Sequence, residues 1–112
     1  MDEQDREAIY RDFHAAVNLA PAELEKWLET DDSKAVGSKP DGDSAESVGH
    51  RSGRRIVDIK RKRKADLDPE DFAHMRKVVG YVHRHLEQRP SGDVERTRWR
   101  YSLMNWGHDP MR

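Results

Sequence analysis

The stretch LDPEDFAHMRKVVGYVHRHLEQRP, residues 67–90, decides the fold. Asp68 is a favoured helix-capping residue, and Pro69 suits the first position of a helix. Apolar side chains then recur at spacings of three and four residues: Phe72, Met75, Val79, Val82 and Leu86. That spacing is typical of a helix packed along one side. We therefore predict a central helix that begins after Asp68 and stops at Pro90.

Two further helices are predicted before this one. Residues Asp2–Asn18 place Ile9 and Phe13 at helical spacing, and acidic residues crowd the first turn, where the helix dipole favours them. Pro21 fits the start of a second, short helix with Leu24, Trp27 and Leu28 on one side. We expect residues 30–33 to end it.

A last helix is predicted after the central one. The turn at residues 90–93 leads into a helix over Val94–Trp106, and Gly107 is well placed to end it. Its inner face carries two tryptophans and two smaller side chains: Trp99, Ser102, Leu103 and Trp106. In so small a protein these rings are expected to supply core, although arginines beside them could also stack on unpaired bases.

The middle of the chain contains a Gly/Ser-rich stretch followed by a basic one. Gly37–Gly49, GSKPDGDSAESVG, has little to bury and is predicted to be a flexible loop. After it, Ser52 is a plausible N-cap for a basic helix over Gly53–Arg63. The β-branched residues of RIVDI also allow a strand, but the lysines and arginines that follow favour helix.

The sequence as a whole predicts one all-α domain spanning residues 1–112. Its 112 residues leave no room for a second independent core. We expect a small bundle of four to five helices: an acidic helical part over residues 1–36, the flexible Gly/Ser-rich loop over 37–50, and the basic, central and Trp-rich helices over 51–112.

Several classes of protein are disfavoured by composition. No apolar run approaches the ~18 residues that a membrane span needs, and the acidic N-terminus is unlike a signal peptide. There is no cysteine, which together with these features favours a cytoplasmic location. We find no catalytic pattern, no cofactor motif and no convincing set of metal ligands, so we expect no enzyme and no cofactor.

The formal net charge of −1 conceals a strong asymmetry. Residues 1–50 sum to −8, whereas residues 51–112 sum to +7. The whole of this positive excess can be credited to RSGRRIVDIKRKRK, residues 51–64, which hold eight basic side chains and one aspartate. Such a split suggests contact with nucleic acid or another acidic surface, and it equally allows the two halves to attract each other within the fold.

The basic segment supplies the candidate binding residues. Concentrated positive charge attracts phosphate groups through the release of counterions, without requiring a particular base sequence. The alternative is a cationic helix end surrounded by solvent, which also suits the negative pole of the helix dipole. The candidate nucleic-acid-binding residues are Arg51, Arg54, Arg55, Lys60, Arg61, Lys62, Arg63 and Lys64. A weaker pattern, GHRSGRR over residues 49–55, suggests backbone amides at a helix start that could hold an anion.

Two functions remain open from these residues. The first is non-enzymatic binding of DNA through its phosphate backbone, which would make the protein nucleoid-associated. The second is a protein-interaction module whose acidic N-terminal half pairs with the basic helix, within the chain, in a homodimer or with an acidic partner. Binding of single strands through Trp99, Tyr101 and Trp106 would require those rings to be exposed.

Four stretches resemble a known family of small proteins, the domain of unknown function family 3140. They are FHAAVNLAPAELEKWLETDDSKAVG (13–37), GHRSGRRIVDI (49–59), HMRKVVGYVHRHLEQRP (74–90) and RWRYSLMNWGHDP (98–110). Members are often labelled DNA-binding proteins, so the resemblance implies that role, but it brings no activity and no catalytic residues. Lys60 departs from the apolar residue expected after IVDI, which would shorten the buried face of the basic helix.

Overall fold

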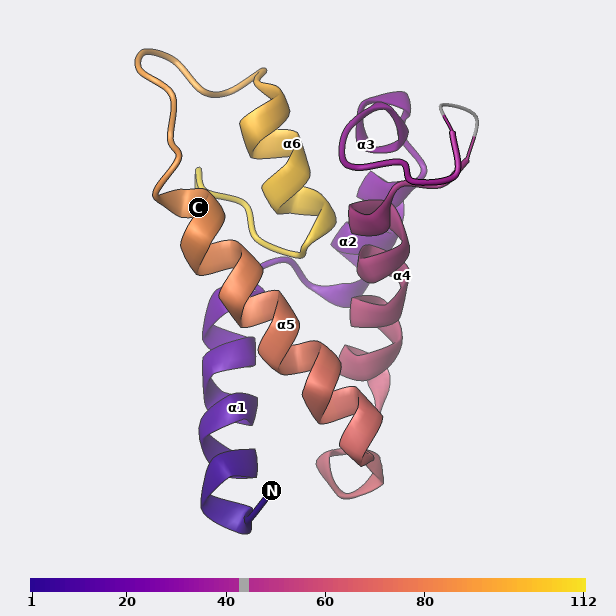
Figure 1. Ribbon diagram of the computed structural model, residues 1–112, viewed down its shortest axis with the longest axis vertical. Coiled ribbons are helices and arrows are strands. Elements are labelled where there is room, and N and C mark those ends of the chain that lie inside the picture. Colours follow the sequence, from indigo (N-terminus) through magenta and orange to yellow (C-terminus); the bar gives the residue numbers. More distant parts are fainter. Residues whose placement is uncertain (43–44) are drawn as a thin grey trace.

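Six α-helices and one 3₁₀ turn form the regular structure of the part described, residues 1–42 and 45–112, in the computed structural model (Figure 1). The described residues contain no strand, so the all-α prediction is confirmed and the basic segment is a helix. The elements are α1 (Glu3–Ala16), α2 (Pro21–Leu28), α3 (Asp31–Ala35), α4 (Val48–Arg61), η1 (Lys64–Asp66), α5 (Pro69–Leu86) and α6 (Arg98–Asn105).

The helices form two packed pairs that α6 holds together. α1 lies along α5, and α2 lies along α4 (Figure 1). α6 contacts α2, α3, α4 and α5, and so fills the upper part of the space between the two pairs. The core at this junction includes Phe13, Leu24, Ile56, Met75 and Leu103, all fully buried.

The central helix begins as predicted. The Asp68 carboxylate accepts a hydrogen bond from the Asp71 N–H at 2.8 Å, and the Asp71 carboxylate accepts one from the Asp68 N–H at 3.1 Å. This reciprocal arrangement satisfies two backbone donors that a helix start leaves without partners. The helix ends at Leu86, before Pro90. Its buried side chains are Phe72, Met75, Val78 and Val82, whereas Val79 and Leu86 are half-buried.

The predicted start of the basic helix was wrong. Ser47, not Ser52, is the N-cap, and its hydroxyl accepts the His50 N–H at 3.0 Å. Ser52 is buried within α4, where its hydroxyl lies 2.9 Å from His74 Nε2. The loop therefore ends before Val48, and its residues Asp43 and Ser44 lie outside the described part. Residues 49–55 lie within α4 rather than ahead of it: the His50 N–H donates to the Ser47 hydroxyl, and from Arg51 onward the amides are used by the helix itself.

Close packing explains why two glycines lie inside α4. A Cβ atom at Gly53 would lie 2.6 Å from the Asn105 carbonyl oxygen and 2.7 Å from a Leu28 methyl group. A Cβ atom at Gly49 would lie 2.9 Å from Trp106 Nε1. These glycines resemble loop residues in the sequence, but here they allow α4 to approach α2 and α6 closely.

Two other predicted boundaries were also displaced. Residues 30–33 do not simply end α2, because the Thr30 hydroxyl accepts the Ser33 N–H at 3.1 Å and caps the extra short helix α3. α6 begins at Arg98 rather than Val94, and Thr97 caps it by accepting the Arg100 N–H at 3.1 Å. Gly107 follows α6 with φ +84°, in the role that was predicted for it.

The residues after α6 are fastened to the connection between α1 and α2. The Asp109 N–H donates to the Asn18 side-chain oxygen at 2.7 Å, and the Asn18 amide donates to the Asp109 carbonyl at 3.0 Å. Arg100 donates to both Asp109 carboxylate oxygens, at 3.1 and 3.0 Å. The segment after α6 is therefore held against the connection between α1 and α2.

One amide ties three helices together beneath α4. Asn105 is fully buried, and its side-chain oxygen accepts hydrogen bonds from Trp27 Nε1 at 2.8 Å and the Ser33 hydroxyl at 2.5 Å. Its side-chain nitrogen donates to the Ser33 carbonyl at 3.0 Å. Because its amide hydrogen-bonds to both α2 and α3, this buried polar group does not carry the cost of an unpaired one.

Candidate nucleic-acid interface

All eight predicted binding residues lie on α4 or on the short segment that follows it. They separate into two groups by what surrounds them. Arg51, Arg54 and Arg55 lie in the middle of α4, beside α5. The other five, Lys60–Lys64, run from the C-terminal end of α4 to the first residue of η1. The two groups have different partners.

Two members of the C-terminal group, Arg61 and Lys64, are bound to carboxylates on the acidic helices. Arg61 donates to both Glu25 carboxylate oxygens on α2, at 2.9 and 3.2 Å. Lys64 Nζ lies 2.7 Å from a Glu7 carboxylate oxygen on α1. Both carboxylates come from the acidic N-terminal part, so these pairs join the negative and positive halves of the sequence within the fold.

Lys62 and Arg63 pair with carboxylates close to the start of α5. Lys62 Nζ lies 2.7 Å from an Asp71 carboxylate oxygen, and the Asp71 side chain is almost fully buried. Arg63 donates to Asp66 at 3.0 Å across one turn, and its side chain is 84% exposed. Arg63 is thus the most exposed of the predicted cations that form ion pairs.

Lys60 points into the fold. Its ammonium group lies 3.3 Å from the carbonyl oxygens of Val17 and Leu19, in the connection between α1 and α2. Burial lowers the pKa of this ammonium group, with a smaller opposing contribution from Glu23. The lysine that interrupts the apolar face of α4 therefore caps two carbonyl groups of a buried connection.

The middle group surrounds Glu46 at the start of α4. Arg54 Nε donates to Glu46 at 2.8 Å, and Arg51 Nε lies 3.7 Å from the same carboxylate. His50 Nδ1 also contacts it. The hydrogen bond from Arg54 is the main cause that lowers the pKa of Glu46 to about 2. The side chains of Arg51 and Arg54 remain 63% and 60% exposed, so water and solutes reach both.

Arg55 is only partly satisfied. Its Nη2 lies 3.4 Å from Asp71, which is a long contact, and Asp71 is already bound more closely by Lys62. Its Nε is buried and has no hydrogen-bond partner among the described residues. A buried donor without a partner costs about 1–3 kcal/mol, so an acceptor that reaches it is favoured.

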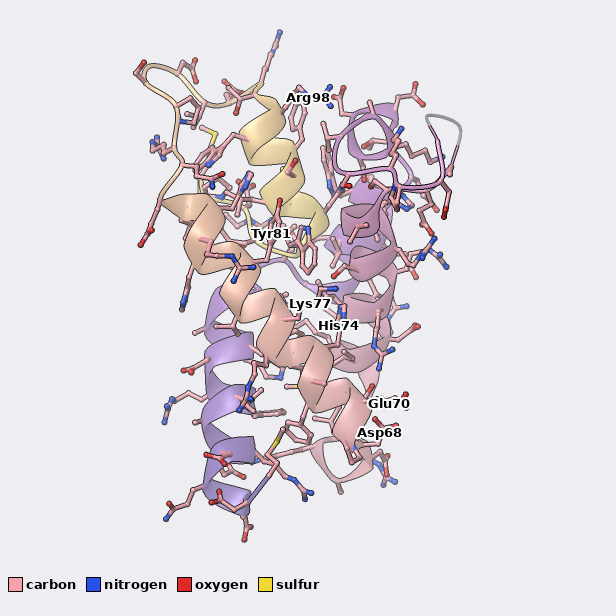
Figure 2. The ribbon with its side chains drawn as sticks, viewed as in Figure 1. Asp68, Glu70, His74, Lys77, Tyr81 and Arg98 are labelled. Carbon is pink, nitrogen blue, oxygen red and sulfur yellow. The ribbon has the colours of Figure 1, made fainter. Side chains whose placement is uncertain are left out.

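These arginines open onto a hollow of about 560 Å³ between α4 and α5. Its charged lining consists of Arg51, Arg54, Arg55, Lys77 and a single carboxylate, Asp58. Lys77 was not predicted as a site residue, and it forms no ion pair with any described residue. Figure 2 shows Lys77 and His74 extending from α5 toward α4. The hollow is thus the place where cations from two helices gather.

His74 contributes no positive charge to the hollow at neutral pH. Burial, and then the charges of Arg55 and Lys77, lower the pKa of its imidazole to about 4. The ring instead lies 2.9 Å from the Ser52 hydroxyl and stacks beside Trp106. His74 is therefore a neutral lining residue of the hollow, whose positive charge comes from the arginines of α4 and from Lys77.

The sequence analysis did not predict a stack of aromatic rings that forms between α5 and α6. The rings follow one another in the order His74, Trp106, Tyr81, His85 and Trp99, with interplanar angles of 13–16°. We call this set the ring ladder. Its signal was present in the sequence, because Trp99 and Trp106 lie seven residues apart, as do His74 and Tyr81, and residues seven apart share a helix face.

The ladder settles the role of the tryptophans. Trp99 is 8% exposed and Trp106 4%, so their ring faces are core, as expected, and are not available for stacking on bases. Trp27 is half-buried and bound to Asn105. Single-strand binding by exposed ring faces is therefore excluded for Trp99 and Trp106.

The described residues contain no group of three or more potential metal-ligating side chains. Within the same residues, no helix has the length and apolar character needed to cross a membrane.

Comparison with known proteins gives one result, a match to a family. No curated protein and no solved structure matched the chain. The family model described as "Protein of unknown function (DUF3140)" matches residues 12–104, which include the end of α1, all of α2–α5 and most of α6. The chain therefore belongs to the DUF3140 family, whose description assigns no activity.

Proposed function

We propose that this protein binds DNA without catalysing a reaction, by contacting backbone phosphates at the hollow between α4 and α5. The observation that carries the proposal is the gathering of Arg51, Arg54, Arg55 and Lys77 around one opening with a single carboxylate. Phosphate oxygens are the ligands that such a cluster attracts, and arginine binds them with two donors at once. Under this proposal the protein is nucleoid-associated.

The ion pairs of the arginines do not oppose this proposal. The side chains of Arg51 and Arg54 are 63% and 60% exposed, so each can also reach a phosphate. In the C-terminal group, Lys62 compensates the buried Asp71 and Lys60 caps buried carbonyls, whereas Arg61, Arg63 and Lys64 form exposed pairs. We place the phosphate contacts at the middle of α4 because Lys77 lies there without an ion pair to the described residues, and because one carboxylate lines the hollow.

The test compares two triple variants that remove equal charge. Binding of a fluorescent duplex is followed by anisotropy over a range of salt concentrations. Four phosphate contacts predict a log–log slope of about −4 for the wild type. The variant R51Q/R54Q/K77Q should lower the steepness of that slope by about 3, whereas R61Q/R63Q/K64Q should leave it nearly unchanged.

Two outcomes of this test would contradict the proposal. No binding of duplex at low salt would overturn DNA binding altogether. Equal losses from the two triple variants would mean that net charge alone attracts the DNA, and would overturn the hollow as the site.

A second candidate function is favoured by the pairs Arg61–Glu25 and Lys64–Glu7. They join the acidic and basic halves across distant parts of the chain, and the same side chains could pair between two copies or with an acidic partner. Analytical ultracentrifugation of the protein without DNA tests the version in which two copies pair. A dimer that dissociates with added salt supports it, and a monomer at every salt concentration contradicts it.

A further inference from the structure

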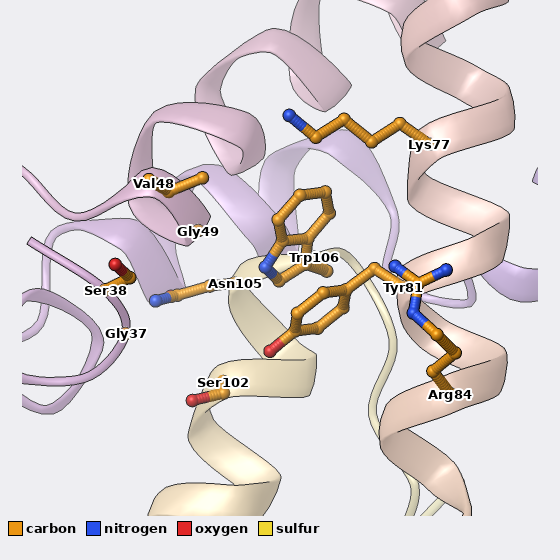
Figure 3. A pocket seen from close by; sticks show the side chains of 10 residues that line it. All are labelled: Gly37, Ser38, Val48, Gly49, Lys77, Tyr81, Arg84, Ser102, Asn105 and Trp106. Atoms are coloured by element: carbon orange, nitrogen blue, oxygen red, sulfur yellow. The ribbon is translucent and has the colours of Figure 1, made fainter. Parts of the chain in front are cut away.

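A smaller pocket of about 230 Å³ adjoins the basic hollow (Figure 3). The two cavities share Val48, Lys77 and Trp106 in their linings, so they lie next to each other along α5, and we call the two together the groove. The small end is mostly apolar, with Tyr81 and Trp106 side by side in its wall. The groove therefore joins an apolar compartment to a cationic one.

The apolar compartment contains a hydrogen-bond donor without a partner. Of the three indole N–H groups, that of Trp27 donates to Asn105 at 2.8 Å and that of Trp99 to the His85 carbonyl at 2.7 Å. Trp106 Nε1 donates to none of the described residues. It lies over Gly49, where the absence of a Cβ atom leaves room for it. Tyr81 stacks on one face of this ring, with 4.2 Å between the ring centroids, and Trp106 lines the pocket, so a ligand there can approach its N–H edge.

Two cations along the groove also lack an ion-pair partner among the described residues. Lys77 and Arg84, which lie on either side of Tyr81 on α5, form no ion pair with the described residues (Figure 3). Arg55 Nε, in the adjoining hollow, is the buried donor without a partner. The groove thus has an indole N–H without a described partner at one end and the cations Lys77 and Arg55 at the other, which suits a ligand with acceptors at both ends.

We propose that this groove binds one unpaired nucleotide, with its base in the small pocket and its phosphate at Lys77 and Arg55. A cavity of 150 Å³ admits benzene, so about 230 Å³ admits a substituted ring. Every base carries acceptors on its edge, and the Trp106 N–H can donate to one of them. The proposal deepens the proposed function and rests on the same attraction of phosphate to the hollow. A free nucleotide and an unpaired nucleotide of a DNA strand share this chemistry.

The test uses the indole N–H signals of the wild-type protein in a ¹⁵N NMR spectrum. The probes are dTMP, thymidine, which lacks the phosphate, and deoxyribose 5-phosphate, which lacks the base. We expect dTMP to shift the Trp106 signal while the Trp27 and Trp99 signals, whose N–H groups are already bonded, stay in place. Binding of dTMP should be about tenfold tighter than binding of either part, since each part loses one end of the groove.

Two variants at Ser38 separate the small pocket from the proposed binding of duplex. Ser38 lines the small pocket and not the hollow, and it is exposed, so a change there should leave the fold intact. S38F should fill the small pocket and abolish the dTMP shift, whereas S38A should retain it. Both variants should bind duplex DNA with the wild-type salt slope, because the lining of the hollow is unchanged.

The outcomes distinguish this inference from the proposed function. A Trp106 signal unmoved by dTMP, or moved equally by deoxyribose 5-phosphate, would overturn the nucleotide site while leaving duplex binding intact. A shift with dTMP but no binding of duplex would overturn the proposed function and keep the site for a free nucleotide. A shift with a short oligothymidylate but not with dTMP would overturn the free nucleotide and assign the site to a strand.

Discussion

The middle and the C-terminal end of α4 both carry positive charge, but their charged side chains have different partners. At the C-terminal end, Arg61 and Lys64 reach the acidic helices α1 and α2, and Lys60 points inward. In the middle, Arg51 and Arg54 share one carboxylate with His50 and border an open hollow. The comparison teaches that density of charge along a sequence does not locate a binding surface. A binding surface also requires that not all of the charged side chains are already paired with other groups of the same protein.

Packing explains why the middle of α4 can keep its arginines at the surface. Gly49 and Gly53 let the opposite side of this half lie against Trp106 and Asn105 with almost no intervening side chain. Contacts of helix against helix therefore hold this half in place. The C-terminal end has no such glycine, and its long side chains provide the attachment instead.

The largest expected effect comes from breaking that close packing. G53A would place a methyl group 2.6 Å from a backbone oxygen that cannot easily move, and we expect a loss of about 2–3 kcal/mol in the free energy of unfolding. G80A is the matched control, because its Cβ would meet only the end of the Arg84 side chain. It should stabilise the protein by about 0.5–1 kcal/mol, since alanine favours a helix interior. Urea unfolding measures both, and equal effects would contradict the close approach.

The next effect is a dependence of stability on pH that arises beside the hollow. The pKa of His74 is about 4 in the fold and 6.5 without it, so the unfolded chain takes up a proton first as the pH falls. The stabilisation from His74 is complete above pH 6.5 and is lost as the pH falls toward 4. It amounts to about 1–2 kcal/mol once partial exposure is allowed for.

The substitution H74Q isolates this contribution. Burial also lowers the pKa of His14 and His85, so some loss of stability over the same interval should remain. We expect the plot of unfolding free energy against pH to be flatter for H74Q than for the wild type. Parallel plots would show that His74 titrates normally in the fold.

A smaller effect is expected from Lys60, the inward-pointing member of the C-terminal group. K60M keeps the length of the side chain but leaves the Val17 and Leu19 carbonyls without its ammonium group. We expect a loss of about 1 kcal/mol. K64M, at an exposed pair, should cost less than about 0.5 kcal/mol. The melting temperatures of the two variants rank them, and the reverse order would contradict the inward role of Lys60.

The smallest effect should come from the carboxylates that hold the C-terminal end. E7Q and E25Q each remove one exposed pair, and each should leave the free energy of unfolding nearly unchanged. Because the proposed interface lies elsewhere, the salt slope of duplex binding should not change either. A steeper slope in the double variant would mean that the freed Arg61 and Lys64 contact phosphate, and would extend the interface to this end.

The elements that the sequence predicted well are those fixed by neighbouring residues. The start of α5 depends on Asp68, Pro69 and Asp71, which interact across a single turn. The start of α4 could not be found in this way, because Ser47 and Ser52 both resemble caps and Gly49 resembles a loop residue. Only the approach of Trp106, more than fifty residues away in the sequence, distinguishes them.

The candidate site was predictable in part for the same reason. Arg51, Arg54 and Arg55 were identified from their charge alone. Lys77, which faces them, was not, because nothing local brings α5 against α4. The partners Glu7 and Glu25 belong to the acidic half that was recognised as a whole, but which cations they would neutralise depends on packing between distant helices.

The ring ladder has an optical consequence. Tyr81 and Trp106 lie 4.2 Å apart with nearly parallel planes, so their near-ultraviolet transitions are held in one fixed, asymmetric arrangement. Circular dichroism in that region should therefore report whether α5 and the end of α6 are assembled, with no added label. The far-ultraviolet signal follows all six helices instead. A protein with helices formed but α6 undocked would keep the second signal and lose the first.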